Sequence, residues 1–280
     1  MAFADLTDCR CYYELRGRGE PVLLIPGLGS TCRVWDPVAE DLAGDLCLIA
    51  PDNRDIGQSV GRRHVRTVLD YSADLLELLD QLQVERVHVL ALSLGGVIAQ
   101  QFVRDHPSRV AGLVLVSSTH HVAPYLREMI KLVGQSARRF PRPLFLRTMA
   151  LLSSGPLFLD ANPKCIERKI EHEMRMKISA LALMRQLRCI AAAELIRQDV
   201  HITAPTLAIA GEHDVLIPSC YSRQLADTIP GSRYLVIPDA GHNPLTEYPQ
   251  RTLPVIKAFL KGVQPRLVDP PEGGRIEYAA

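Results

Sequence analysis

Apolar and polar residues follow one another along this chain in blocks that predict strands and helices in turn. Short apolar runs predict strands, and the amphipathic stretches between them predict helices. In the predicted helix 67–82, Tyr71, Leu75 and Leu78 share one stripe, whereas Asp70 and Asp74 lie off it. Such alternation is typical of a mainly parallel sheet covered by helices. Strands are predicted at 3–15 (one or two edge strands), 21–26, 46–50, 86–91, 110–117, 205–210 and 233–237, and helices at 34–43, 67–82, 94–105, 218–229 and 246–261.

The alternation stops after Thr119 and resumes at 204. Residues 120–200 have a helical pattern that several prolines interrupt, which predicts a helical cap inserted between two core strands. Ligands of open α/β sheets bind beyond the carboxyl ends of the strands, so a cap over that edge would cover the binding site. The expected division is a core of 1–118 and 204–262, a cap of 119–203 and a Pro/Gly-rich tail of 263–280.

The composition fits one large α/β domain with an insertion, because 47% of the 280 residues are apolar. No apolar run approaches the roughly 18 residues of a membrane span, and the N-terminus has no signal-like pattern. We therefore expect a cytoplasmic protein. The seven cysteines are scattered and lack the paired spacing of a zinc site. Free thiols, no metal and no cofactor are the resulting expectations.

The net charge of +1 hides an uneven distribution. Residues 119–203 hold 14 Lys and Arg against 7 Asp and Glu, so the predicted cap is basic and the remainder acidic. A basic cap could attract an anionic substrate or surface, or its charges could simply solvate exposed helices. Aromatic residues make up only 5% and no basic stripe interleaves with them, which argues against a nucleic-acid partner. The pattern leaves monomer and dimer open.

Ser93 lies between a predicted strand and a predicted helix, in the segment Ala91-Leu92-Ser93-Leu94-Gly95-Gly96. A sharp turn there would expose the hydroxyl as a nucleophile, and it requires small residues two positions before and after the serine. Gly95 meets this requirement, and Ala91 stands where the pattern G-x-S-x-G has glycine. The alternative is an ordinary serine at a helix N-cap.

Four further strand ends carry turn or charged residues, among them an acid and a base. The strand at 21–26 runs into Gly27-Leu28-Gly29, which would leave a backbone N–H pointing into a cleft. The strand at 205–210 is followed by Glu212 and Asp214, and the strand at 233–237 is followed by His242. Arg54 and Asp55, after the strand at 46–50, are expected to form a buried turn network.

With these segments in place, residues 3–262 resemble the α/β-hydrolase family. Its order of nucleophile, acid and base matches Ser93, Asp214 and His242. The resemblance implies that Ser93 attacks, that His242 is the general base, and that Asp214 orients the imidazole, with Glu212 as the alternative acid. It also implies an oxyanion hole formed by the backbone N–H groups of Leu28 and Leu94.

The substrate pocket is predicted less directly. Trp35 could border it or pack the first helix against the sheet, and His120 and His121 could touch substrate or be structural. The aliphatic run of the cap could pack on the core or form an apolar acyl-binding wall. The predicted pocket residues are Gly27, Trp35, His120, Leu146 and Met149.

The resemblance implies a serine hydrolase that cleaves a carboxylic ester of a small to medium apolar molecule through an acyl-enzyme. The same side chains could instead hydrolyse a carbon–carbon bond of a diketone, open a lactone or carry out perhydrolysis. A function of another class, a non-catalytic small-ligand receptor on a hydrolase scaffold, is disfavoured by the intact serine, acid and histidine.

Overall fold

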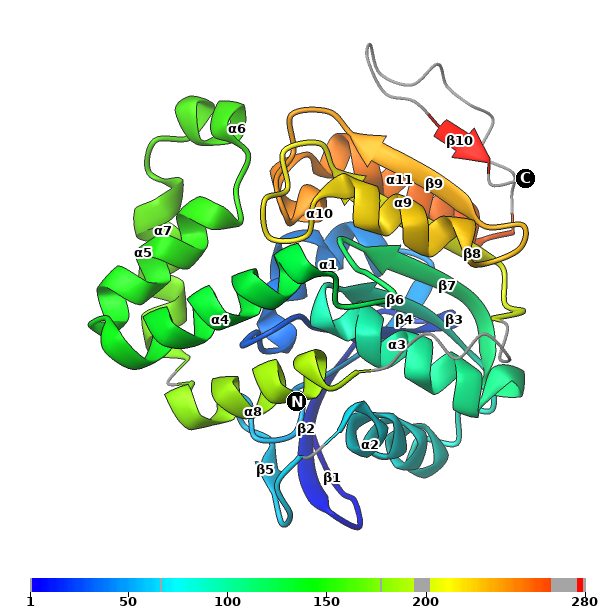
Figure 1. Cartoon of the computed structure of the whole chain (residues 1–280). Helices are drawn as coiled ribbons and strands as arrows, with labels where there is room; N and C mark the ends of the chain where they lie inside the picture. The colour runs from blue at the N-terminus through cyan, green and yellow to red at the C-terminus, as the bar shows by residue number, and fades with distance from the viewer. Residues whose placement is uncertain (1, 66, 177, 194–201, 263–275, 279–280) are drawn as a thin grey trace.

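A twisted sheet with helices on both faces forms the centre of the molecule (Figure 1). The computed structural model describes residues 2–65, 67–176, 178–193, 202–262 and 276–278. Within these residues the sheet has ten strands in the order β1-β2-β4-β3-β6-β7-β8-β9-β10, and β5 pairs with β2. The strands are β1 (Ala2–Asp5), β2 (Cys9–Arg16), β3 (Glu20–Ile25), β4 (Leu46–Pro51), β5 (Val60–Gly61), β6 (Val87–Leu92), β7 (Val110–Val116), β8 (Thr206–Gly211), β9 (Arg233–Ile237) and β10 (Ile276–Tyr278).

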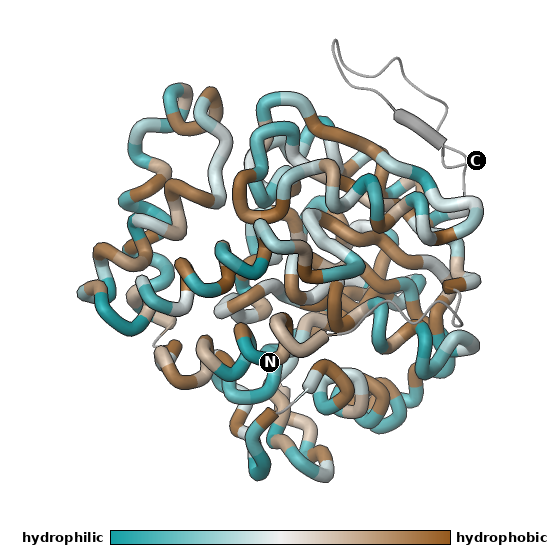
Figure 2. Tube along the Cα trace, viewed as in Figure 1, coloured by the Kyte–Doolittle hydropathy of each residue, from teal (hydrophilic) through white to brown (hydrophobic). Residues whose placement is uncertain are grey.

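The neighbouring strands β4, β3, β6, β7, β8 and β9 are parallel. The pairings of β1, β2, β5 and β10 at the two ends of the sheet are antiparallel. The central strands are mostly apolar, and nearly all of their residues are buried, as strands covered on both faces require. Figure 2 shows this apolar centre in brown. All the carboxyl ends of β3, β6, β8 and β9 therefore meet at one edge, which confirms the predicted arrangement of a mainly parallel sheet flanked by helices.

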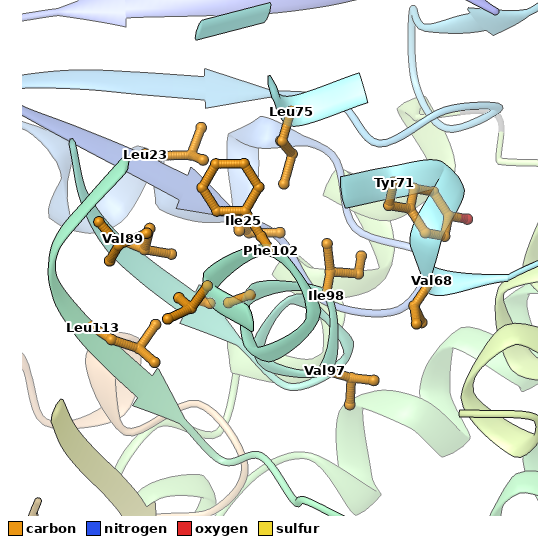
Figure 3. Close-up of a cluster of buried hydrophobic side chains, with 14 of the residues drawn as sticks. Leu23, Ile25, Val68, Tyr71, Leu75, Val89, Val97, Ile98, Phe102 and Leu113 are labelled. Carbon is orange, nitrogen blue, oxygen red and sulfur yellow. The ribbon is translucent and has the colours of Figure 1, made fainter. Parts of the chain in front are cut away.

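Two apolar cores cover the two faces of the sheet. One lies beneath α2 (Val68–Gln81), α3 (Leu94–Asp105) and α9 (Ser219–Asp227), and Figure 3 shows its side chains, among them Tyr71 and Phe102. The other lies beneath α1 (Asp36–Leu42) and α11 (Pro249–Leu260). Helix α2 begins where its sequence predicts, because the Asp70 carboxylate accepts a hydrogen bond from the Thr67 N–H at 2.9 Å.

Among the described residues between β7 and β8, five helices are inserted, on the left of Figure 1. They are α4 (Pro124–Arg139), α5 (Arg142–Leu152), α6 (Pro156–Ala161), α7 (Cys165–Arg175) and α8 (Ala180–Ala191), called here the α4–α8 insertion. Val133, Leu183 and Leu187 form its small apolar core. The helical character of this region is as predicted, and its status as a separate cap domain stays a prediction. Most of the predicted tail lies outside the described residues, and its segment Ile276–Tyr278 pairs with β9.

Several local features of the structure differ from the prediction in detail. The predicted helix 246–261 is two helices, α10 (Pro244–Glu247) and α11, because Pro249 lacks the N–H needed to continue α10. The predicted helix 34–43 begins as a 3-10 turn, Cys32–Trp35, before α1. Asp74, placed off the apolar stripe, is only 8% exposed because it forms a buried ion pair with Arg54. The two-residue strand β5 was not predicted at all.

Asp55 follows Arg54 in the turn after β4 and has a left-handed backbone, with φ of 66°. Asp55 Oδ1 accepts a hydrogen bond from the Gly61 N–H at 3.2 Å, so the turn network predicted around Arg54 and Asp55 is present.

In the described part of the chain, every helix is too short or too polar to cross a membrane.

Candidate active site

Ser93 occupies the sharp turn between β6 and α3. Its φ of 56° and ψ of −118° are unusual for a residue with a Cβ, and such a backbone costs on the order of 1–3 kcal/mol. The surroundings hold it there: the Ser93 N–H donates to the Val116 carbonyl at 2.8 Å, and the Ser118 hydroxyl donates to the Ser93 carbonyl at 3.1 Å. Ser93 is the N-cap residue of α3, but its side chain makes no cap hydrogen bond, unlike that of an ordinary capping serine.

Gly95 is required by the packing of this turn. A Cβ at position 95 would lie 2.1 Å from the carbonyl oxygen of Ile25, which belongs to the neighbouring strand β3. Ala91, in contrast, is fully buried within β6 and accommodates its methyl group. The small-residue requirement predicted from sequence is therefore strict after the serine and looser before it.

Gly95→Ala is expected to destabilise the fold strongly, because backbone atoms cannot move away from the new methyl group. We expect the free energy of unfolding to fall by about 3 kcal/mol or more in urea denaturation. Gly44→Ala is the matched control, since a Cβ there meets nothing within 4 Å. A loss at Gly95 no larger than that at Gly44 would contradict this description of the turn.

His242 and Asp214 form a buried pair beyond the ends of β9 and β8. The His242 Nδ1 lies 2.8 Å from Asp214 Oδ2, and the Asp214 side chain is 0% exposed. Asp214 Oδ1 accepts the N–H groups of Leu216 and Ile217, both at 2.9 Å. An ionised carboxylate can only accept, so Nδ1 donates its proton to Oδ2 and Nε2 is left to accept a proton.

Glu212, the alternative acid, is exposed and accepts a hydrogen bond from the Asp239 N–H. The structure thus brings Asp214, and not Glu212, to the histidine. No hydrogen bond joins the Ser93 hydroxyl to His242 within the described residues, so that contact stays a prediction. Contacts between a nucleophile and its base are often long before substrate binds.

The turn Gly27–Gly29 lies beside Ser93. A Cβ added to Gly27 would be 3.3 Å from the Cβ of Ser93, and Gly29 has a left-handed φ of 64°. The Ser30 N–H donates to the Gly27 carbonyl at 3.2 Å, and the Asn53 amide donates to the Pro26 carbonyl at 3.3 Å. This placement is compatible with an oxyanion hole formed by the N–H groups of Leu28 and Leu94, which stays a prediction.

The remaining predicted pocket residues lie in different surroundings. Trp35 is 2% exposed and packs in the core beneath α1, the structural alternative that the sequence offered. Met149 is half-buried against the apolar core of the α4–α8 insertion, and Leu146 is half-buried on the same helix. Their contact with substrate, like that of Gly27 and His120, stays a prediction.

His120 and His121 follow β7, with their ring centroids 4.4 Å apart. Their Nδ1 atoms are buried and have no hydrogen-bond partner among the described residues. Burial, with a smaller contribution from His121, lowers the pKa of His120 to about 4. His120 is therefore neutral at physiological pH.

This pKa makes His120 a source of acid sensitivity. Below the usual histidine pKa of 6.5 the unfolded chain binds a proton that folded His120 does not bind, so stability falls as the pH decreases from about 6.5 to about 4. Between about pH 7 and pH 4.5, we expect the melting temperature of His120→Gln to fall by less than that of the unsubstituted protein. His172→Gln, an exposed substitution on α7, is the control and should behave like the original protein.

Two buried residues near the site were missed in the sequence. Glu247 accepts the N–H groups of Gly155, at 2.9 Å, and Gly241, at 2.8 Å. It so joins the α4–α8 insertion to the loop between β9 and α10 that carries His242, called here the histidine loop. Burial raises the pKa of the Glu247 carboxyl. Gln186, on α8, accepts the Gly29 N–H at 2.7 Å. The available signal was Gln186 itself, a polar residue on the same helical stripe as Leu183 and Leu187.

The chain belongs to the alpha/beta hydrolase fold family, whose model matches residues 20–249. A putative carbamate hydrolase, RutD of Azorhizobium caulinodans, is 26% identical over 242 residues, which are 86% of this chain and 91% of that protein. The family and this relative support a hydrolase activity.

Solved structures agree with the family assignment. A thermophilic esterase from Thermogutta terrifontis has a TM-score of 0.82 at 26% identity, with 94% of this chain and 99% of that one covered. A putative non-heme bromoperoxidase, BpoC of Mycobacterium tuberculosis H37Rv, has a TM-score of 0.80 at 27% identity, with 91% and 97% covered.

Proposed function

We propose that this protein is a serine hydrolase that cleaves carboxylic esters through an acyl-enzyme on Ser93. The observation that carries the proposal is the buried His242–Asp214 pair at the sheet edge where the strained Ser93 turn also lies. A binding protein has no need of a backbone strained by on the order of 1–3 kcal/mol, whereas an exposed nucleophile needs this turn. The esterase name of the 26% identical Thermogutta terrifontis structure supports an ester as substrate.

In the proposed mechanism, Ser93 Oγ attacks the ester carbonyl while His242 Nε2 takes the hydroxyl proton. Asp214 stabilises the imidazolium that forms, and the Leu28 and Leu94 N–H groups bind the oxyanion. Collapse of this intermediate releases the alcohol, which receives the proton from His242. Water, deprotonated by His242, then attacks the acyl-serine, and Ser93 is regenerated with release of the acid.

We also propose that the α4–α8 insertion is the cap of this site and that it favours an apolar acyl group. Leu146 and Met149 of α5 are half-buried, and the loop after α5 contacts the histidine loop, where the His242 N–H donates to the Ser153 carbonyl at 3.0 Å. Aryl esters with acyl chains of two to about twelve carbons should differ in kcat/KM, with an optimum at intermediate length. Equal values along the series would refute an apolar acyl site.

A fluorophosphonate probe tests the catalytic proposal against the receptor alternative. An activated serine is phosphonylated with loss of fluoride, and peptide mass mapping should locate the adduct on Ser93. We expect labelling to be lost on prior heat denaturation, because activation depends on the folded His242–Asp214 pair. A folded protein that hydrolyses no ester and leaves Ser93 unlabelled would be a ligand-binding protein on this scaffold.

A further inference from the structure

Gln186 reaches from the α4–α8 insertion into the core, at the turn beside Ser93. Its side chain is 1% exposed, and its Oε1 accepts a hydrogen bond from the Gly29 N–H at 2.7 Å. The amide oxygen has to face Gly29, because an N–H group can be satisfied only by an acceptor. The colours of Figure 1 show that α8, in yellow-green, is far along the chain from β3, in blue. A residue of the insertion thus determines the hydrogen bonding of a core turn.

The two peptide units on either side of Leu28 are each held by one hydrogen bond. The carbonyl of Gly27 accepts the Ser30 N–H, and in a planar trans peptide this directs the Leu28 N–H to the opposite side. The next unit carries the Gly29 N–H, which Gln186 holds. The first bond comes from within the turn, whereas the second comes from α8.

Without Gln186, the second of these peptide units would lose its partner. Gly29 has a φ of 64°, and glycine rotates between backbone conformations at little steric cost. The Ser30 N–H, which holds the peptide unit that carries the Leu28 N–H, comes directly after Gly29, so a rotation at Gly29 would also displace this donor. The direction of the Leu28 N–H therefore depends, through Ser30, on an acceptor supplied by α8.

Helix α8 is attached to the core on both sides of this contact. Arg185 donates to Asp55 Oδ2 at 3.0 Å, with both side chains less than one-fifth exposed. The Leu28 side chain packs against the apolar core of the insertion, which includes Leu183 and Leu187, as well as against the main core. These contacts hold α8 in the register that places Gln186 at Gly29.

We propose that Gln186 is a positioning residue of the oxyanion hole, so that the α4–α8 insertion contributes to the catalytic geometry as well as covering the site. The inference rests on the proposed function, in which the Leu28 N–H binds the oxyanion. Loss of the Gln186 acceptor weakens binding of the transition state and leaves binding of the uncharged ester unchanged.

Gln186→Met tests this inference, because methionine has a similar volume and no acceptor of comparable strength. Removal of a whole oxyanion donor costs about 100- to 1,000-fold. For a donor that is only misdirected we expect kcat/KM to fall roughly 10- to 100-fold. The affinity for an aryl trifluoromethyl ketone, which forms an oxyanion adduct, should fall by a similar factor. The affinity for the matching methyl ketone should stay within about twofold, since it reports ground-state binding.

Arg188→Gln, on the exposed side of α8, is the control and should leave all three quantities unchanged. Gln186→Leu repeats the test with a second apolar side chain, so that misfolding of one variant leaves the other to decide. A folded Gln186 variant with kcat/KM and trifluoromethyl ketone affinity within twofold of the original protein would overturn the inference. Equal losses for the two ketones would also overturn it, since they would indicate general damage to the pocket. Failure of the proposed function is recognised separately, as ester turnover that does not depend on Ser93.

Discussion

Ser93→Ala is expected to reduce ester turnover by about 10⁴-fold or more, because it removes the atom that forms the acyl-enzyme. The same substitution should leave the free energy of unfolding nearly unchanged, since alanine meets the same backbone strain at φ 56° as serine does. Steady-state hydrolysis of an aryl ester and urea denaturation measure the two effects separately.

Ser108→Ala, an exposed substitution, serves as the control and should retain full activity. If Ser93→Ala kept more than about a hundredth of the activity while remaining folded, another group would have to be the nucleophile. Ser93→Gly should be equally inactive and more stable by about 1 kcal/mol, because glycine relieves the positive φ.

Asp214→Asn is expected to reduce kcat by about 10⁴-fold, through the wrong imidazole tautomer. The asparagine oxygen can still accept the N–H groups of Leu216 and Ile217, which leaves its NH2 group to face His242 Nδ1. Nδ1 must then accept a hydrogen bond, so the imidazole proton lies on Nε2. A protonated Nε2 cannot accept the proton of the Ser93 hydroxyl. The loss should appear in kcat with little change in the affinity for a non-reactive substrate analogue.

Glu212→Gln is the matched control for Asp214→Asn. Glu212 lies on the same strand end, is exposed and does not contact the imidazole. We expect its activity to stay within about twofold of the original protein, since surface changes of this kind are usually small in effect. Comparable losses in the two variants would show that negative charge near the site matters, and not the hydrogen bond to Nδ1.

The sequence predicted the sheet and the positions of the candidate residues well, because both depend on local pattern. Buried parallel strands are continuous apolar runs, and the chemistry-bearing residues follow them directly, as Ser93 follows β6 and Asp214 follows β8. The structure adds the His242–Asp214 contact, which joins residues 28 positions apart. The resemblance to the family proposed that pairing, and periodicity alone could not have done so.

The contacts between the insertion and the core could not be predicted, because they depend on tertiary packing. Asp74 lies off the apolar stripe of its helix, yet Arg54 from another element pairs with it in the interior. Gln186 occupies an apolar helical position because its amide serves Gly29, which lies 157 residues earlier. In each case a polar residue is buried because its partner comes from a distant part of the chain.

Direct detection of the acyl-enzyme tests the central claim most directly. The protein is mixed with an activated aryl ester, quenched in acid within the first turnover, and digested for peptide mass spectrometry. We predict an added acyl mass on the peptide that contains Ser93, a matching burst of alcohol release, and neither signal in Ser93→Ala. Ester turnover with no acyl group on Ser93, or with the acyl group on another residue, would contradict the account.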